Sequence, residues 1–149
     1  MYSKAGILPY IRKSGNIYYL LRQNQKQNQK WDFFIAKRNS EDMFDPLRTA
    51  SRAFINETKN TIFTRDKNRI YKLLLNNKHQ VITLHTNEGI IYCYMLDLSG
   101  LVYSMDALRN IDKVSESENK QAKLSFFSRQ ELVKIPLNNM LIHVLHKYF

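Results

Sequence analysis

The side chains that could do chemistry gather in the segment Trp31–Asn60. Glu57 is one of its acids, and a carboxylate can hold a divalent cation or orient a water molecule. Asn56, beside it, offers a neutral carbonyl oxygen that can coordinate a cation without offsetting its charge. Lysine and arginine can instead bind phosphate directly, without metal. The candidate phosphate-binding cations are Lys37, Arg38, Arg52 and Lys59.

A short helix is expected to position these side chains. Asp45 can cap its first N–H groups, and Pro46 fits the first helical position, where no N–H is needed. Residues 53, 56 and 57 share one face, because positions three and four apart are neighbours on a helix. The residues expected on the core face are Leu47, Ala50 and Phe54.

The segment resembles the Nudix hydrolase signature. That pattern runs Gly, five residues, Glu, seven residues, Arg-Glu, an aliphatic residue, any residue, Glu-Glu, any residue, Gly and an aliphatic residue. Laid on this chain without a gap, its chemical positions fall on Arg38, Phe44, Arg52, Ala53, Asn56, Glu57 and Lys59. Short segments in and around the signature also resemble those of the family. They lie at residues 4–9, 31–37, 50–52, 57–58, 126–128 and 131–132. The resemblance therefore covers most of the chain.

This resemblance implies a single domain over residues 1–149 with an α/β (α+β) fold. The expected architecture is a Nudix-like α/β/α sandwich, with a mixed sheet between helices. The resemblance also implies hydrolysis of nucleoside diphosphates linked to another group. In such enzymes the signature glutamates hold Mg²⁺, whose charge lets a nucleophile approach the anionic phosphates.

The positions that would carry this chemistry have lost most of their acids. Among the four signature glutamates only Glu57 is present, and Phe44 and Ala53 offer no ligand. Arg38 replaces a glycine that permits an unusual loop backbone. A residue with a Cβ adopts such a backbone only at a cost, so we expect a rearranged loop. The acids that could supply substitute ligands are Glu41, Asp42, Asp45, Glu88, Asp97, Glu116 and Glu118.

The strand pattern agrees with this architecture. Residues 5–11 and 16–22 predict a β-hairpin, and residues 23–30 predict a polar loop near the mouth of a Nudix-like cleft. The nearly continuous apolar run at residues 90–98 predicts a central strand covered on both faces. Residues 104–114 predict a further helix.

Four other side chains each have two interpretations. Trp31 and Tyr18 could stack on a base, because stacking tolerates any base, or they could pack in the core. His143 and His146, three residues apart on a predicted helix, could bind zinc or form a surface pair.

The net charge of +10 is unevenly distributed. Residues 1–30 hold six Lys or Arg and no acid. This excess favours a polyanionic partner through phosphate contacts, with a merely soluble basic surface as the alternative. There is no apolar run near membrane-spanning length, no signal-peptide organisation, and a single cysteine, Cys93. We therefore expect a cytoplasmic or other reducing intracellular location and no membrane partner.

Three functions are consistent with these observations. The first is a degenerate, catalytically inactive Nudix-fold protein that binds nucleotide or RNA, or joins a larger assembly, with no cofactor. Its Arg52 would bind phosphate or pair structurally with Glu57. The alternative is an active hydrolase of nucleoside polyphosphates or capped RNA. It would use Mg²⁺ or Mn²⁺ in a rearranged site with Glu57 and Asn56 as ligands. The third is a structural subunit that binds a protein partner and no nucleotide.

Overall fold

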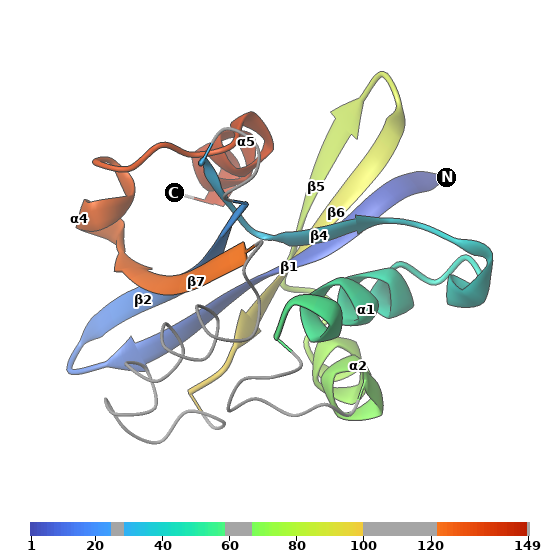
Figure 1. The fold of residues 1–149 in the computed structure, drawn as a ribbon. Helices are drawn as coiled ribbons and strands as arrows, with labels where there is room; N and C mark the ends of the chain where they lie inside the picture. Colours follow the sequence, from blue (N-terminus) through green and yellow to red (C-terminus); the bar gives the residue numbers. More distant parts are fainter. Residues whose placement is uncertain (25–28, 59–66, 100–121, 149) are drawn as a thin grey trace.

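One mixed sheet forms the middle of the molecule (Figure 1). The computed structural model describes residues 1–24, 29–58, 67–99 and 122–148. Its strands are β1 (Tyr2–Lys13), β2 (Asn16–Asn24), β3 (Trp31–Asp32), β4 (Phe34–Lys37), β5 (Val81–Thr86), β6 (Gly89–Asp97) and β7 (Ala122–Ser128). The sheet order is β3-β2-β1-β6-β5, with β4 also paired to β1 and β7 also paired to β2. Because β1 runs parallel to β6 and antiparallel to β2 and β4, the sheet is mixed, as the sequence predicted.

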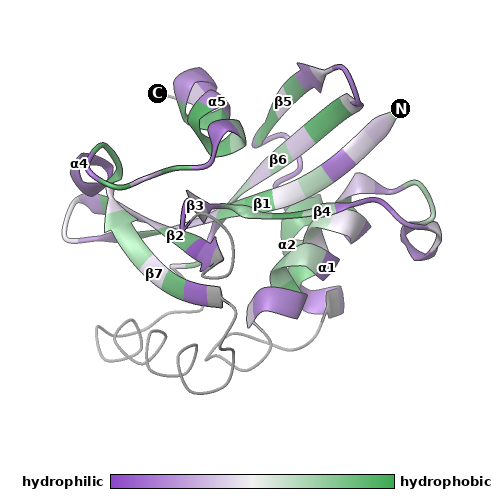
Figure 2. Ribbon diagram, turned by 45° about the horizontal axis from the view of Figure 1, so that its top comes forward, coloured by the Kyte–Doolittle hydropathy of each residue, from purple (hydrophilic) through white to green (hydrophobic). Residues whose placement is uncertain are grey.

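Helices lie on both faces of this sheet, and they confirm the predicted α/β/α arrangement (Figure 1). They are α1 (Pro46–Thr58), α2 (Lys67–Asn76), α4 (Arg129–Leu132) and α5 (Asn139–Tyr148), with a 3₁₀ helix, η1 (Ser40–Asp42), before α1. Helices α1 and α2 share one hydrophobic cluster with the sheet, and α4 and α5 share a second cluster on the opposite face. Figure 2 shows α5 hydrophilic on its outer side and hydrophobic toward the sheet.

Strand β6 contributes to both clusters, as expected of a central strand. Cys93 is fully buried in the α4–α5 cluster, and Tyr94 is 6% exposed in the α1–α2 cluster. Successive side chains of a strand point to opposite faces, so the apolar run fills both layers.

The predicted hairpin is confirmed by the register of β1 and β2, which includes Ile11 opposite Tyr18. Ser14 and Gly15 form its turn with φ of 52° and 79°. Two consecutive positive φ values are those of the turn that matches the twist of the flanking strands.

The segment 31–37, which matches the family before the signature, forms two strands that are separated at Phe33. The segment changes partner there, because β3 pairs with β2 whereas β4 pairs with β1. The Phe33 N–H donates to the Asp32 carboxylate at 2.8 Å instead of to a neighbouring strand.

Gly6 allows β4 to approach β1 closely. A Cβ at this position would collide with the carbonyl oxygen of Phe34 and would lie 2.9 Å from the Phe33 ring. The position therefore requires a residue without a side chain.

Several sequence predictions lie outside the described residues: Lys59, Glu116, Glu118, the helix at 104–114 and part of the loop at 23–30. Among the described helices, none is long and apolar enough to cross a membrane.

Candidate functional site

Helix α1 begins where the sequence predicted, at Pro46. The Asp45 carboxylate accepts the Leu47 N–H at 3.0 Å, as a capping side chain does. Its other oxygen accepts the Tyr71 hydroxyl of α2 at 2.7 Å, and Arg48 lies 3.8 Å away. Asp45 therefore joins two helices and is not available as a metal ligand.

The loop before α1 is organised around a buried carboxylate, Asp42, which is 3% exposed. Asp42 and Asn39 accept each other's backbone N–H groups at 2.9 and 3.2 Å. The carboxylate also accepts the Thr49 hydroxyl at 2.7 Å and Arg52 Nη2 at 2.9 Å. Thr49 is in turn 2.8 Å from the Tyr2 hydroxyl, so the network connects β1, the loop and α1.

The electrostatics of Asp42 follow from these partners. Burial raises the pKa of Asp42, but hydrogen bonds from Arg52, Thr49 and the Asn39 N–H outweigh burial and hold the pKa below its usual value. The carboxylate is thus ionised and fully occupied. Of the substitute acids expected from sequence, Asp42 and Asp45 both have structural roles.

The expectation that Arg52 pairs with Glu57 is wrong. Arg52 donates to Asp42 and, at 2.6 Å, to the Lys37 carbonyl oxygen. Residues five positions apart are separated by about 140° around a helix, so Arg52 and Glu57 point in different directions. Of the two roles that the sequence left open for Arg52, phosphate binding and structural pairing, its contacts support the structural one.

The loop is rearranged, but not at Arg38. The left-handed residues are Met43 and Phe44, with φ of 53° and 59°, and Arg38 is not among the positive-φ residues. Each such residue costs of order 1 kcal/mol or more. Met43 and Phe44 are also each 72% exposed, so no burial of their side chains offsets this cost.

Glu57 faces an arginine that the sequence did not indicate. Its carboxylate lies 3.9 Å from Arg22 Nη1 of β2, and these side chains are 30% and 20% exposed. The two neighbouring signature positions differ in environment, since Ala53 is 5% exposed and Asn56 is exposed. The Arg22 Nε is buried and has no hydrogen-bond partner among the described residues.

A second carboxylate, Asp32, lies next to this pair. Asp32 on β3 is directly opposite Arg22 in the strand register. Burial raises the pKa of Asp32 to about 6, although the Phe33 N–H, Arg22 and Lys4 all act to lower it. One partly exposed guanidinium therefore lies near two carboxylates on β3 and α1.

Comparisons with known proteins identify the fold. No family model matches the sequence, and no curated protein matches it. Ap4A hydrolase of C. elegans is 13% identical with a TM-score of 0.53, over 99% of this chain and 96% of that chain. The NUDIX domain of Shewanella oneidensis NrtR, complexed with ADP ribose, is 9% identical with a TM-score of 0.57, over 99% of this chain and 86% of that chain. A candidate Nudix hydrolase of Listeria monocytogenes is 11% identical with a TM-score of 0.55, over 98% and 90%.

This chain has the Nudix fold. The matches extend over nearly its whole length, so the resemblance drawn from the sequence is confirmed at the level of architecture. At these identities the comparison carries the fold and no activity.

The Nudix fold implies a divalent cation, and the described residues do not fit one. No group of three or more His, Cys, Asp or Glu in the described ranges could hold a metal ion. Glu57 faces a guanidinium, and Asn56 offers a neutral oxygen only. Asp97, another substitute acid, pairs with Arg12 at 3.7 Å. Mg²⁺ prefers carboxylates and waters in near-octahedral geometry, which this donor set does not supply.

Arg22 and Asp32 are the residues that sequence reasoning missed. A signal for Arg22 was present: it follows Tyr18 and Leu20 at the strand period, so it points to the same face as the buried Leu20. A charged residue at an inward position calls for a partner. No comparable signal identified Glu57 as that partner, because strand β2 and helix α1 are far apart in sequence.

The predicted phosphate-binding cations are only partly brought together. Lys37 and Arg38 are both exposed at the end of β4, and the Lys37 carbonyl contacts Arg52. Lys37, Arg38 and Arg52 thus lie along one side of the loop, whereas the Arg22–Glu57 pair lies toward the other end of α1.

The two candidates for base stacking, Trp31 and Tyr18, differ in burial. Trp31 is 7% exposed and edge-on to Phe127, with ring centroids 4.7 Å apart, so it packs in the core. Tyr18 is half-buried and packs against the α1–α2 cluster. Core packing is the alternative that the sequence left open for both.

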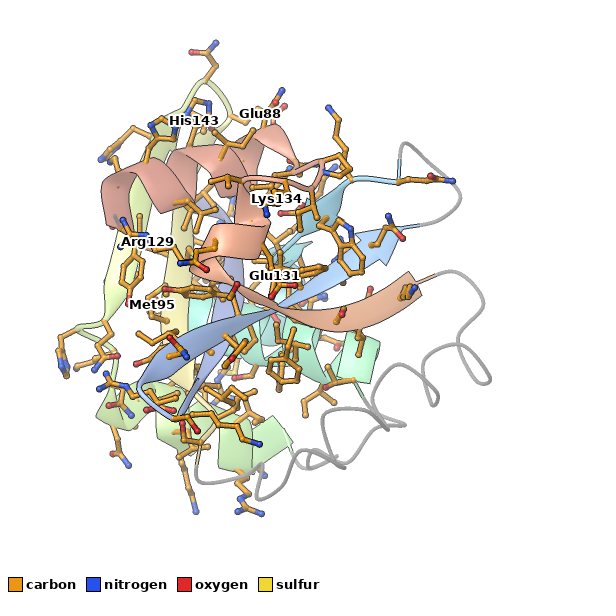
Figure 3. All side chains as sticks on the ribbon, turned by 90° about the vertical axis from the view of Figure 1, so that its left-hand side faces the viewer. Glu88, Met95, Arg129, Glu131, Lys134 and His143 are labelled. Atoms are coloured by element: carbon orange, nitrogen blue, oxygen red, sulfur yellow. The ribbon has the colours of Figure 1, made fainter. Side chains whose placement is uncertain are left out.

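His143 and His146 lie on α5, on the opposite side of the sheet from α1. Figure 3 shows His143 on this helix, with Arg129, Glu131 and Lys134 on or beside α4. Both histidines are exposed and line a hollow that also includes His85. No group of three or more metal-ligating residues that could hold an ion occurs around them in the part of the chain that the structure describes.

Proposed function

We propose that this chain is a Nudix-fold binding module that holds the phosphates of nucleotides or RNA on side-chain cations and does not hydrolyse them. The observation that supports the proposal most directly is the pairing of Glu57 with Arg22 at 3.9 Å. A guanidinium carries a permanent charge and a rigid fork of donors that matches phosphate oxygens. It can therefore supply the charge that a metal ion provides in a hydrolase.

The pair is suited to exchange one anion for another. At 3.9 Å the ion pair between Arg22 Nη1 and the Glu57 carboxylate is long, so Glu57 holds this end of the guanidinium only loosely. Arginine–phosphate contacts are shorter and can be bidentate. An incoming phosphate would take donors of Arg22 that Glu57 holds only loosely.

The fold relatives are consistent with a nucleotide ligand. One is an Ap4A hydrolase, and another is a NUDIX domain complexed with ADP ribose. If lysine and arginine side chains bind the phosphates directly, a protein of this fold can bind a nucleotide without a metal ion.

An active hydrolase is the second candidate, and Asp32 is the observation that favours it. A carboxylate whose pKa is raised to about 6 can exchange protons near neutral pH. Incubation with Mn²⁺ and a panel of nucleotides and capped RNA decides the matter. Turnover that is abolished by Glu57→Gln would establish the hydrolase and overturn the binding module.

The binding proposal is tested by calorimetric titration of ADP-ribose in the presence of EDTA. We expect Arg22→Met to weaken binding at least about tenfold, as loss of a charge-assisted contact does. The matched control is Arg12→Met, which removes an exposed arginine of β1 that pairs with Asp97 and should leave affinity unchanged. Binding that requires divalent metal, or no binding of nucleotide or RNA at all, would contradict the proposal. The second result would favour the structural subunit.

A further inference from the structure

The strained tip of the loop before α1, formed by Met43 and Phe44, has no explanation in the core of the protein. Both residues have left-handed backbones, and both side chains are 72% exposed. A residue with a Cβ adopts this conformation at a cost, and an exposed aromatic ring recovers nothing by burial. Such a conformation persists only where the surroundings enforce it, and enforced strain on a surface points to a use.

The surroundings do enforce it. On one side the Asn39–Asp42 capping box fixes η1, and the Met43 N–H donates to the Ser40 carbonyl at 3.4 Å. On the other side the Asp45 N–H donates to the Asp42 carbonyl at 2.9 Å, and Asp45 caps α1. These hydrogen bonds therefore hold the backbone of Met43 and Phe44 rigidly in place.

The exposed ring has a cationic neighbour. The guanidinium carbon of Arg38 lies 5.5 Å from the centroid of the Phe44 ring and 6.0 Å from that of the Tyr2 ring. Arg38 also contacts the Met1 sulfur. An aromatic face beside a guanidinium is the combination that takes a nucleobase by stacking and its phosphate by charge.

The charges around the tip agree with an anionic ligand. Lys37 precedes Arg38 and is exposed, whereas Asp42 is buried and neutralised by Arg52. Asp45 is bound by Tyr71 and lies near Arg48, which leaves Glu41 as the exposed acid of the loop among the described residues. The whole chain carries a net charge of +10.

The distance between Phe44 and the Arg22–Glu57 pair sets the length of a ligand that could contact both. Phe44 precedes the first turn of α1, and Glu57 lies in its last turn, so they are separated by about 18–20 Å along the helix. A mononucleotide, or ADP-ribose with its two phosphates at Arg22, extends roughly 10 Å from that point and does not reach Phe44, but a single strand does.

We propose that Phe44, with Arg38, is a base-stacking platform that extends the phosphate site along α1 and selects single-stranded RNA over a mononucleotide. This inference rests on the proposed function, because the strand is anchored at Arg22. It assigns to Phe44 a role in place of the glutamate that the Nudix signature has at this position.

The test measures two ligands on the same intact protein: a fluorescein-labelled 12-nucleotide oligoadenylate RNA by anisotropy, and ADP-ribose by calorimetry. Phe44→Ala should weaken RNA binding by roughly fivefold to a hundredfold and leave ADP-ribose affinity unchanged. Phe44→Trp should keep RNA binding near the wild-type level, and the fluorescence of the new indole should be quenched by the stacked base. Arg38→Met should lower the salt dependence of RNA binding, whereas Phe44→Ala should not.

Val133→Ala is the control, since Val133 is 83% exposed and follows α4 on the opposite face of the sheet. RNA affinity that is equal in wild type, Phe44→Ala and Val133→Ala would overturn the platform. Equal losses for RNA and ADP-ribose would also overturn it, because they would indicate a displaced loop. Wild-type protein that binds ADP-ribose but not the RNA refutes the platform alone, and protein that binds neither refutes the proposed function with it.

Discussion

Arg22 and Arg52 are equally exposed arginines that each meet a carboxylate, yet their contacts assign them different roles. Arg52 makes hydrogen bonds of 2.6–3.2 Å to Asp42 and to the Lys37 carbonyl. Arg22 has one long ion pair of 3.9 Å to Glu57 and a buried Nε with no partner among the described residues. A satisfied polar network rigidifies a structure, whereas a guanidinium held through its outer nitrogen by one long ion pair can exchange that partner for a ligand. The loop is therefore held by Arg52, and the ligand is proposed to bind Arg22.

The carboxylate opposite Arg22 gives a prediction about pH. Burial raises the pKa of Asp32 to about 6, so the ionised form is destabilised in the folded state. Below pH ~4 Asp32 is protonated in both the folded and the unfolded state and does not change the free energy of unfolding. As pH rises from there through about 6, Asp32 lowers the free energy of unfolding, because it ionises more readily in the unfolded state. Asp32→Asn should gain stability relative to wild type between pH 4 and pH 7, by up to about 3 kcal/mol for a shift of this size.

Urea unfolding at several pH values measures this gain. The lowered pKa of Asp42 acts with the opposite sign, but it is present in both proteins and cancels in the difference. The asparagine side chain of the variant would keep an oxygen that accepts the Phe33 N–H. A difference between the two proteins that stays constant from pH 4 to pH 7 would show that Asp32 does not titrate as proposed.

At the scale of elements, the features that were predictable from sequence are the local ones. The cap at Asp45, the proline start of α1 and the turn at Gly15 each depend on residues within a few positions. The central strand β6 was predictable because its apolar run is continuous. The architecture came from the spacing of the signature and its flanking words, although the chemical residues had changed.

The contacts that were missed join segments distant in sequence. The Arg52–Asp42 pair spans ten residues across a loop whose folding the sequence did not specify. The Arg22–Glu57 pair joins β2 to α1, which are 35 residues apart in the sequence at these two positions. The break at Phe33 arises because β3 and β4 have different partner strands, which is a property of the sheet as a whole.

The approach of β4 to β1 gives a prediction at this scale. Gly6→Ala would place a Cβ against the Phe34 carbonyl and the Phe33 ring, so the strands would have to separate. We expect a loss of about 3 kcal/mol or more in the free energy of unfolding, the upper range for overpacking. Gly15→Ala is the contrasting variant, because its Cβ meets nothing within 4 Å and only its φ of +79° is unfavourable. It should cost about 1–2 kcal/mol.

Chemical denaturation gives the free energy of unfolding of both variants. It thereby compares the cost of a packing collision at Gly6 with the cost of an unfavourable backbone conformation at Gly15. A loss for Gly6→Ala no larger than that for Gly15→Ala would contradict the prediction, because it would mean that β4 moves away from β1 easily. The Phe33 and Phe34 side chains pack on opposite clusters, so separation of β4 would disturb both layers.

At the scale of the whole molecule, the proposed ligand path follows one helix. Figure 1 shows α1 lying against the sheet. Arg22 pairs with Glu57 in the last turn of α1, whereas Arg38 lies beside Phe44, before its first turn, and Lys37 precedes Arg38. The helices on the opposite face pack on a separate cluster and are not needed for this path. A basic chain could bind RNA anywhere on its surface, so the number of phosphate contacts distinguishes a defined path from general attraction.

That number is measurable as a salt dependence. If Arg22, Lys37 and Arg38 each contact one phosphate, the logarithm of RNA affinity should fall with the logarithm of salt concentration with a slope of about −2, or about twentyfold between 50 and 200 mM. Anisotropy titrations of the 12-nucleotide RNA give this slope. Arg22→Met should reduce it by about 0.7, the value for one contact to a single strand. Arg12→Met should leave it unchanged, since Arg12 pairs with Asp97 away from α1. Equal reductions in the two variants would mean that the charge of the whole surface, and not a path along α1, attracts the nucleic acid.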